Sequence, residues 1–339
     1  MGGAAPLAST KGFQAGGADR DGPILPRCRE RGSPRPRSRA LIRATKETEA
    51  GRRYLDLQRK AKQTGRPTDE LIQLYALEGF LDRLARSAHA DRFVLKSGVL
   101  LAALDARRPT RDIDLAAQGL ENSAERVLVL IREVAAITIA DGLIFNAEHA
   151  TAETIRDDDQ YSGVRVTLGG ELSRATIRLH VDINVGDPIW PEPQQVQLPR
   201  LLDGTLLIRG YPLEMVFAEK IVTAIALGTA NTRWRDFLDL YVLIRRHAVD
   251  AQTLRTSMQH VAQYRGVPLS PLKPALAGFP DIAQSRWLAW LRKQRLDTAA
   301  PAEFATILEV VVSFAEPLIG NDPAAITWNP YEQAWSGTG

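Results

Sequence analysis

Residues 107–117 read RRPTRDIDLAA, and this stretch decides the fold because it places two carboxylates on one side of a strand. Side chains alternate along a strand, so Asp112 and Asp114 point to one face while Ile113 and Leu115 point to the other. Two carboxylates a few ångströms apart repel each other unless a cation or a proton lies between them. A divalent ion with oxygen ligands is the simplest resolution.

The same alternation recurs in ATIRLHVDINV, residues 175–185, which we expect to be a second strand. His180, Asp182 and Asn184 share one face of it, and apolar side chains share the other. If the two strands are neighbours, Asp182 becomes a third carboxylate facing the first two. Three carboxylates can hold two Mg²⁺ ions about 4 Å apart, an arrangement that clamps the attacking and leaving oxygens of an in-line displacement at phosphorus. His180 is expected to be a hydrogen-bonded structural residue.

A phosphate-type turn comes shortly before these carboxylates. RFVLK (92–96) predicts a short strand, and SGVLLAALDA (97–106) predicts a helix that opens at Ser97-Gly98. Gly98 lets the backbone approach a ligand, Ser97 offers a hydroxyl, and the start of a helix presents free N–H groups to an anion. Either feature alone is common in ordinary loops and caps. Their combination in this order predicts a metal-dependent nucleotidyl-transfer site.

The remaining pattern predicts an α/β half followed by an all-α half, and hence two domains, 45–205 and 206–339. A further strand is expected at 162–168. Helices are expected at 49–65, 69–88, 122–136, 213–228, 232–247, 251–265, 283–294 and 302–316.

Residues 1–44 differ from the rest in composition and charge. They carry nine basic and three acidic groups, so their net charge is +6, while that of the remaining chain is −3. Because this Gly/Pro/Arg/Ser-rich segment cannot bury enough apolar surface to fold, we expect it to be disordered. A solvated tail is the favoured interpretation, and a nucleic-acid-binding arm is the alternative.

Composition also excludes several classes of protein. The single cysteine, Cys28, leaves no intramolecular disulfide and no cysteine-built zinc site. No window approaches the roughly 18 uninterrupted apolar residues of a membrane span, and the N-terminus has no apolar core of a secretory signal. We therefore expect a cytoplasmic protein without a membrane partner.

Three further strings narrow the interpretation to a family: DINVGDPI (182–189), YPLEMVFAEKIVTAI (211–225) and NTRWRDFLDLYVLI (231–244). Together with the Ser-Gly turn and the paired aspartates, they resemble the AbiEii/MenT nucleotidyltransferase toxins of the polymerase-β nucleotidyltransferase superfamily. The resemblance runs from about residue 45 to 250. It departs from the family at one point, because the family usually reads Lys-Gly-Gly where this chain has Lys96-Ser97-Gly98.

The resemblance implies the fold and the site residues. The fold would be a polymerase-β-like mixed sheet with helices, followed by a helical domain that completes the site. Asp112 and Asp114 would be metal ligands, and Asp182 would be a further ligand or the general base. Lys220 would contact the triphosphate, and Asp236 would complete the site from the helical half. The nucleotide would be bound by Lys96, Ser97, Gly98, Thr110, Arg111 and Lys220.

The sequence leaves the roles of two other aspartates, Asp239 and Asp187, less well defined. Asp239 lies three residues after Asp236, on the same helix face, where it is either part of the site or half of a surface ion pair. Asp187, in Gly-Asp-Pro, is expected to be a turn carboxylate and not a ligand.

The implied function is a Mg²⁺-dependent enzyme, with Mn²⁺ as an alternative ion, that attaches a nucleotide from an NTP to an acceptor and releases pyrophosphate. By resemblance the acceptor is an RNA, the tRNA 3′ end, and the modification arrests growth. The partner would be a cognate antitoxin, such as a winged-helix AbiEi/MenA-like protein. We regard QSRWLAWLRKQR (284–295) as the candidate RNA patch, although it also fits an amphipathic core helix with a solvated basic face.

Two alternatives stay open at this point. The same chemistry could act on a small molecule, such as an aminoglycoside, or on a protein hydroxyl. From a different class, the carboxylates could hold a structural ion in a non-catalytic binding protein. A phosphate-type turn and a distant lysine are unusual beside a structural ion, and they disfavour the second alternative.

Overall fold

The computed structural model describes residues 44–156, 162–320 and 326–337. The predicted disordered segment 1–44 lies outside these residues except for Ala44, so that expectation stays a prediction. The small charged helix that was expected to follow it is present as α1, Glu49–Thr64, which Thr48 caps by accepting a hydrogen bond from the Gly51 backbone N–H.

A seven-stranded mixed sheet carries the carboxylates. Its strand order is β3-β4-β5-β2-β1-β7-β6, with β2 parallel to β5 and antiparallel to β1. The two aspartate-bearing strands are therefore neighbours, as the sequence analysis required. The strands are β1 (Phe93–Lys96), β2 (Asp112–Ala117), β3 (Leu143–Arg156), β4 (Ser162–Leu172), β5 (Ala175–Val185), β6 (Gln194–Pro199) and β7 (Thr205–Gly210).

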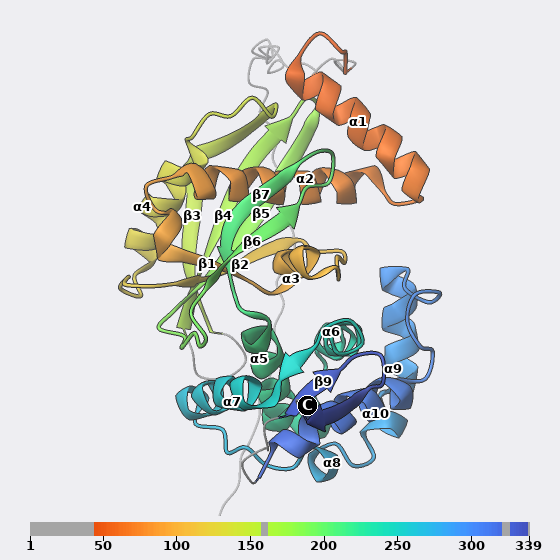
Figure 1. Ribbon diagram of the computed structural model, residues 1–339. Coiled ribbons are helices and arrows are strands. Elements are labelled where there is room, and N and C mark those ends of the chain that lie inside the picture. Colours follow the sequence, from red (N-terminus) through yellow and green to blue (C-terminus); the bar gives the residue numbers. More distant parts are fainter. Residues whose placement is uncertain (1–43, 157–161, 321–325, 338–339) are drawn as a thin grey trace, which may run out of the picture. The chain divides into compact units, whose positions relative to one another are not determined.

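Helices α2 (Thr68–Arg86) and α4 (Ala124–Ala135) lie across this sheet, as Figure 1 shows. Most of α2 is buried, including Arg83, whose guanidinium forms a two-pronged ion pair with Asp141 at 2.6 and 3.1 Å. The predicted helix after β1 is short. It consists of α3 (Ser97–Leu100), which continues as the 3₁₀ turn η2 (Leu101–Leu104).

The C-terminal part is mostly helical, with α5 (Leu213–Leu227), α6 (Trp234–Ile244), α7 (Ala251–Arg265), α8 (Leu272–Ala275), α9 (Phe279–Gln294) and α10 (Phe304–Ala315). It also contains a three-stranded sheet of β8 (Val249–Asp250), β9 (Ile326–Asn329) and β10 (Ala334–Gly337) (Figure 1). The expectation of an all-α C-terminal half is wrong in this respect. The reason is long-range packing: Trp328 on β9 is buried against Phe314 and donates its indole N–H to the Ile244 carbonyl.

Three strands of the large sheet were not predicted, namely β3, β6 and β7. β6 and β7 lie around residues 205 and 206, where the boundary between the two domains was expected. Apolar side chains from the sheet, from α2 and from α5 to α10 belong to one continuous buried cluster. The division into domains at residues 205 and 206 stays a prediction. None of the described helices combines the length and the apolar character that crossing a membrane requires.

Candidate active site

The paired carboxylates lie where the strand alternation placed them. Along β2, Asp112 and Asp114 are half-buried while the intervening Ile113 is fully buried. Asp114 lies directly opposite Asp182 of β5, and Asp112 lies opposite His180. His180 Nδ1 is 3.1 Å from the Thr167 hydroxyl, which is consistent with the structural role expected for this histidine. Three carboxylates therefore share one face of two adjacent strands.

Asp182 is held by a cation from the next strand. Arg165 of β4 lies opposite it in the sheet and donates two hydrogen bonds, at 2.8 and 2.7 Å, to its two carboxylate oxygens. Among the described residues, no group of three or more His, Cys, Asp or Glu side chains is arranged to hold a metal ion. An ion bound by all three aspartates would have to share Asp182 with Arg165. The three-ligand metal site stays a prediction.

Asp112 and Asp114 fit a divalent cation better. The pKa of Asp114 is raised to about 6, first because it is buried and then because Asp182 and Asp112 place negative charge beside it, against the opposing effect of Lys96. Within the described part of the chain, no hydrogen bond or ion pair joins these two carboxylates to another side chain. Mg²⁺ and Mn²⁺ prefer carboxylate oxygens as ligands, and these two carboxylates have no ion-pair partner among the residues described.

The turn before α3 is tight. Ser97 adopts a left-handed backbone conformation, with φ of 49°, which glycine adopts at less cost. Gly98 packs against the segment that enters β2, because a Cβ added there would lie 2.6 Å from the Thr110 hydroxyl oxygen. The absence of a side chain at Gly98 therefore allows the turn to lie this close to Thr110.

Lys96 is buried and neutralised within the protein. Its ammonium lies 2.7 Å from Asp187 and 2.9 Å from Glu219, and 5.1 Å from the centre of the Tyr211 ring. Burial alone would lower its pKa, but Glu219, Tyr211 and Asp187 outweigh burial, and the pKa lies well above its ordinary value. Asp187, expected to be only a turn residue, is thus an ion-pair partner of Lys96.

Lys220 is the centre of a second buried cluster. Its ammonium donates to Asp236 at 2.6 Å and to Asp239 at 2.9 Å. Burial lowers the pKa of Lys220, but Asp236 and Asp239 raise it more, so the net shift is upward. Burial likewise opposes ionisation of Asp236, and Lys220 and Arg233 outweigh it, so the pKa of Asp236 lies well below its usual range.

Arg108 joins this cluster to the segment before β2. Its guanidinium binds Asp239 through two hydrogen bonds, at 2.7 and 3.0 Å, and approaches the Thr110 hydroxyl at 3.4 Å. Asp239 is 3% exposed, so it is not half of a surface ion pair. It is the shared buried anion between Arg108 and Lys220.

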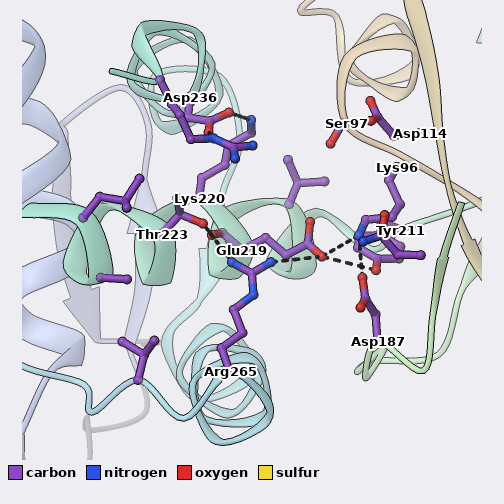
Figure 2. A pocket seen from close by; sticks show the side chains of 16 residues that line it. Lys96, Ser97, Asp114, Asp187, Tyr211, Glu219, Lys220, Thr223, Asp236 and Arg265 are labelled. Carbon is purple, nitrogen blue, oxygen red and sulfur yellow. Dashed lines mark hydrogen bonds and ion pairs between the residues drawn. The ribbon is translucent and has the colours of Figure 1, made fainter. Parts of the chain in front are cut away.

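Glu219 and Lys220 are successive residues of α5, yet they serve different clusters. Figure 2 shows Lys220 directed toward Asp236 and Glu219 directed toward Lys96. A cavity of about 130 Å³ lies between the two clusters, and Ser97 and Asp114 also line it. Helix α5 therefore contributes one cation, Lys220, and one anion, Glu219, to the lining of this cavity.

A larger cleft of about 1450 Å³ opens beside this cavity. The sheet, the turn before α3, and helices α5, α6 and α9 all contribute to its walls. The predicted site residues that line it are Ser97, Gly98, Thr110, Arg111, Asp112, Asp114, Asp182, Lys220 and Asp236. Lys96 lines only the smaller cavity. The structure thus gathers the predicted residues around two connected spaces, and their functional roles remain predictions.

The sequence patterns gave no role to Arg108, Arg165 or Glu219. Arg108 lies in the quoted basic segment, and its charge beside a strand of aspartates was a usable signal. Arg165 is on the strand SGVRVTL, which was predicted, but its register against Asp182 was not. Glu219 precedes Lys220 in the string that carried the resemblance, where only the lysine was given a role.

Comparison with known proteins identifies a family for most of the chain. The sequence profile described as "Nucleotidyl transferase AbiEii toxin, Type IV TA system" matches residues 79–310, which include the turn, both aspartate strands, Lys220 and Asp236. The search of curated proteins finds no match.

Solved structures offer only distant similarity. The crystal structure of JHP933 from Helicobacter pylori has 17% identity and a TM-score of 0.44, covering 73% of this chain and 91% of that one. A second H. pylori structure, described as a candidate nucleotidyltransferase, has 16% identity and a TM-score of 0.43, covering 74% of this chain and 98% of that one.

Proposed function

Because the chain belongs to the AbiEii nucleotidyl transferase toxin family of type IV toxin–antitoxin systems, we propose that it is a metal-dependent enzyme that transfers a nucleotide from an NTP to an acceptor. Pyrophosphate is the second product. The acceptor we propose is RNA, at the 3′ end of tRNA, whose modification blocks aminoacylation and arrests growth. A cognate antitoxin, such as a winged-helix protein of the AbiEi/MenA type, would restrain the activity.

One observation carries this proposal: Asp112 and Asp114 share a face with Asp182 on the wall of a large cleft, and Lys220 lines the same cleft. Carboxylates that hold a cation and a buried lysine are the two charge types that nucleotidyl transfer needs, because negative charge develops on the phosphate oxygens. We assign metal binding to Asp112 and Asp114. Asp182 serves as a further ligand or as the general base toward the acceptor hydroxyl.

A divalent ion at Asp112 and Asp114 would neutralise the phosphates and polarise the reacting phosphorus. The chain's own residues would do the rest. Lys220, fixed by Asp236 and Asp239, would present a positioned positive charge to the triphosphate. Ser97, Gly98, Thr110 and Arg111 line the cleft at the turn and before β2, where they would bind and orient the nucleotide.

Lys96 has a different part in this proposal. It lies in the smaller cavity with Asp187 and Glu219, and two carboxylates already neutralise its charge. We propose that it binds the nucleotide from this position while sharing its ammonium with those carboxylates. Its adjacent residue, Ser97, lines both the cavity and the cleft and connects the two.

The deciding experiment is incubation of the protein with each α-labelled NTP, total cell RNA and Mg²⁺, in parallel with small hydroxyl-bearing acceptors and with protein alone. Label in the tRNA fraction for one NTP supports the proposal. Label in a small molecule or in the protein replaces the RNA acceptor with one of those. Absence of label and of pyrophosphate in every reaction would leave only a non-catalytic ion-binding protein.

A matched pair of variants separates the chemistry from contamination. Asp112→Asn removes charge from the carboxylate face and should abolish the labelled product. Asp203→Asn is the control, because Asp203 is an exposed carboxylate whose only ion-pair partner among the described residues is Arg53, away from the cleft. Loss of label with Asp112→Asn but not with Asp203→Asn assigns the activity to this protein, and equal labelling by both variants would exclude Asp112 from the proposed metal site.

A further inference from the structure

The cleft is larger than an NTP requires. Small-molecule sites occupy about 300–1000 Å³, and this cleft measures about 1450 Å³. The predicted nucleotide-binding and metal-binding residues that line it lie on the strands, on α5, at the turn before α3 and just before β2. The last turn of α9 lines the same cleft and has no part in the proposed chemistry. This wall is the surface that remains to be explained.

Exposed cations outnumber exposed carboxylates on the cleft wall, where Asp69 is the exposed carboxylate among the described lining residues. Asp112, Asp114 and Asp182 are half-buried on the sheet face. By contrast, five exposed cations line the cleft and have no ion-pair partner among the described residues: Arg111, Arg178, Arg235, Lys293 and Arg295. Exposed cations without acidic partners are available to phosphates, and several of them around one cleft fit a chain of phosphates better than a single triphosphate.

Helix α9 adds an aromatic side chain to this surface. Trp287 is buried in the core and donates its indole N–H to the Pro301 carbonyl. Trp290 stacks on Trp287, with ring centres 5.3 Å apart and planes inclined by 21°, yet it is only half-buried and lines the cleft. No residue of the described chain accepts a hydrogen bond from its indole N–H. One tryptophan therefore supports the core, and the other is held in place at the cleft wall.

We propose that the last turn of α9 binds the unpaired 3′-terminal segment of a polynucleotide acceptor, with Trp290 stacking on a base and Lys293 and Arg295 contacting phosphates. The inference rests on the proposed transfer to RNA and names the surface that holds the acceptor. Stacking on an aromatic ring next to a basic groove is the usual way in which proteins bind single strands. A duplex end offers no unstacked base to Trp290, so it would bind more weakly.

The test is binding of a fluorescently labelled 12-nucleotide single-stranded RNA with a free 3′ hydroxyl, followed by anisotropy at several salt concentrations, with the full chain. Lys293→Gln combined with Arg295→Gln should weaken binding by about tenfold at low salt. The slope of log affinity against log salt should fall by about 1.4, since each phosphate contact on a single strand contributes about 0.7. A blunt RNA duplex of the same length should bind more weakly than the single strand.

The same helix supplies the matched control. Arg286 and Arg292 are exposed on α9 but do not line the cleft, so Arg286→Gln combined with Arg292→Gln removes the same charge from another side. This control should bind RNA as the unchanged protein does. Equal loss of binding in both double variants, or no loss in the cleft-side variant, would overturn the proposal.

Trp290 is tested with replacements that preserve packing on Trp287. Trp290→Phe should retain part of the affinity, and Trp290→Leu should lose about tenfold or more, the scale of removing one stacked base. Equal affinity of the leucine and phenylalanine variants would overturn the stacking role. Binding of a labelled NTP, measured alongside, should be unchanged in all of these variants.

The outcomes separate the two proposals. If RNA is labelled by the enzyme but the cleft-side variants bind it normally, this inference fails while the proposed function stands. If no NTP is transferred to any acceptor, the proposed function fails, and the effect of the α9 variants on binding still decides whether this surface holds a single strand.

Discussion

Lys220 is the residue whose role is best defined by its surroundings. It is 7% exposed and neutralises both Asp236 and Asp239. In the protein without nucleotide, an uncharged residue in place of Lys220 would lower the free energy of unfolding, because these buried carboxylates would lose a partner. With nucleotide bound, the phosphates would compete for the same ammonium, and the interaction should be strongest as charge develops in the transition state.

We therefore expect Lys220→Ala to lower kcat by about a hundredfold or more, the scale of removing one positioned charge. It should also lower stability, by at most roughly 3–5 kcal/mol, because it removes the cation that two buried carboxylates share and leaves Asp236 only Arg233 and Asp239 only Arg108. Steady-state kinetics on protein shown to be folded by circular dichroism would measure the first effect, and urea unfolding the second.

Lys220→Arg is the companion variant. It restores the charge but not the geometry of the ammonium, because a planar guanidinium is not a point charge, so rescue of kcat should be partial. If both variants keep full activity and only unfold more easily, Lys220 is a structural ion-pair residue and the helical part loses its role in catalysis.

Asp236 makes a pH-dependent contribution to stability. Its pKa in the folded protein lies below the ordinary value of about 3.9. Its contribution is therefore complete above the unfolded pKa and is lost as the pH falls through the folded pKa. Asp236→Asn should destabilise the protein by roughly 3 kcal/mol at pH 7, and the difference from the unchanged protein should shrink below about pH 4.

Urea unfolding of both proteins at pH 7, 5 and 3.5 measures this difference directly, because the other titrating groups are common to both. A difference that stays constant from pH 7 to 3.5 would show that the Lys220–Asp236 pair does not stabilise the fold. Asp203→Asn, which alters an exposed carboxylate, is a suitable reference with little expected effect.

Asp112→Asn tests the carboxylate face itself. Asp112 is half-buried and lies on the same face as Asp114 and Asp182, so losing its charge relieves repulsion. Transfer should be abolished while the melting temperature is unchanged or slightly raised. Retained transfer by the variant, measured with the labelled-NTP assay, would exclude Asp112 from the metal site.

At the scale of elements, the turn between β1 and α3 is coupled to the start of β2 by a direct contact. Gly98 leaves room for Thr110, whose hydroxyl oxygen and methyl carbon would lie 2.6 and 3.1 Å from an added Cβ. Thr110 is itself buried and follows Arg108, which binds Asp239. A change at the turn should therefore be felt at Asp112, two residues after Thr110.

Gly98→Ala should destabilise the protein by about 1–3 kcal/mol, the cost of overpacking. Thr110→Ala removes both atoms that the new methyl would meet, so the double variant should be more stable than the sum of the single changes predicts. Denaturant unfolding of the four proteins gives the coupling energy. Additive effects would mean that Gly98 and Thr110 do not interact.

The elements also show what the sequence could predict. β2 and β5 were predictable because a period of two, with buried Ile113 and Val181 between polar neighbours, is a local pattern. β6 and β7 were missed because their alternation is weak: Leu198 is the one fully buried side chain of β6, and Leu207 on β7 is exposed. β9 was missed because it is four residues long and one of its two partners, β8, is two residues long and distant in sequence.

For the whole molecule, the candidate site depends on contacts that no local pattern contains. The aspartates and the turn could be predicted because each lies in a short string. The pairing of Arg108 with Asp239 joins residues 131 positions apart, and that of Arg165 with Asp182 requires the register of two strands. Sequence patterns therefore supplied the proposed site residues but not Arg108 and Arg165, which pair with Asp239 and Asp182.

The N-terminal segment provides the prediction at this scale. Residues 1–44 contain no motif of the proposed site and have a composition that does not pack. Deleting them should leave kcat on a short acceptor unchanged. A large fall in kcat would make the segment part of the enzyme, whereas weaker acceptor binding that is strongest at low salt would identify it as an electrostatic arm.

The buried link between Arg108, Asp239 and Lys220 has a consequence for how this gene can change. Asp239 is the buried anion that Arg108 and Lys220 share, so a neutral residue at Asp239 leaves Arg108 without an ion-pair partner among the described residues, and replacing either cation removes one of the two partners of Asp239. Neutral drift at these codons is therefore restricted, most strongly at Asp239. If the protein arrests growth, cells that survive its expression should carry inactivating alleles at these three codons more often than at exposed arginine or aspartate codons.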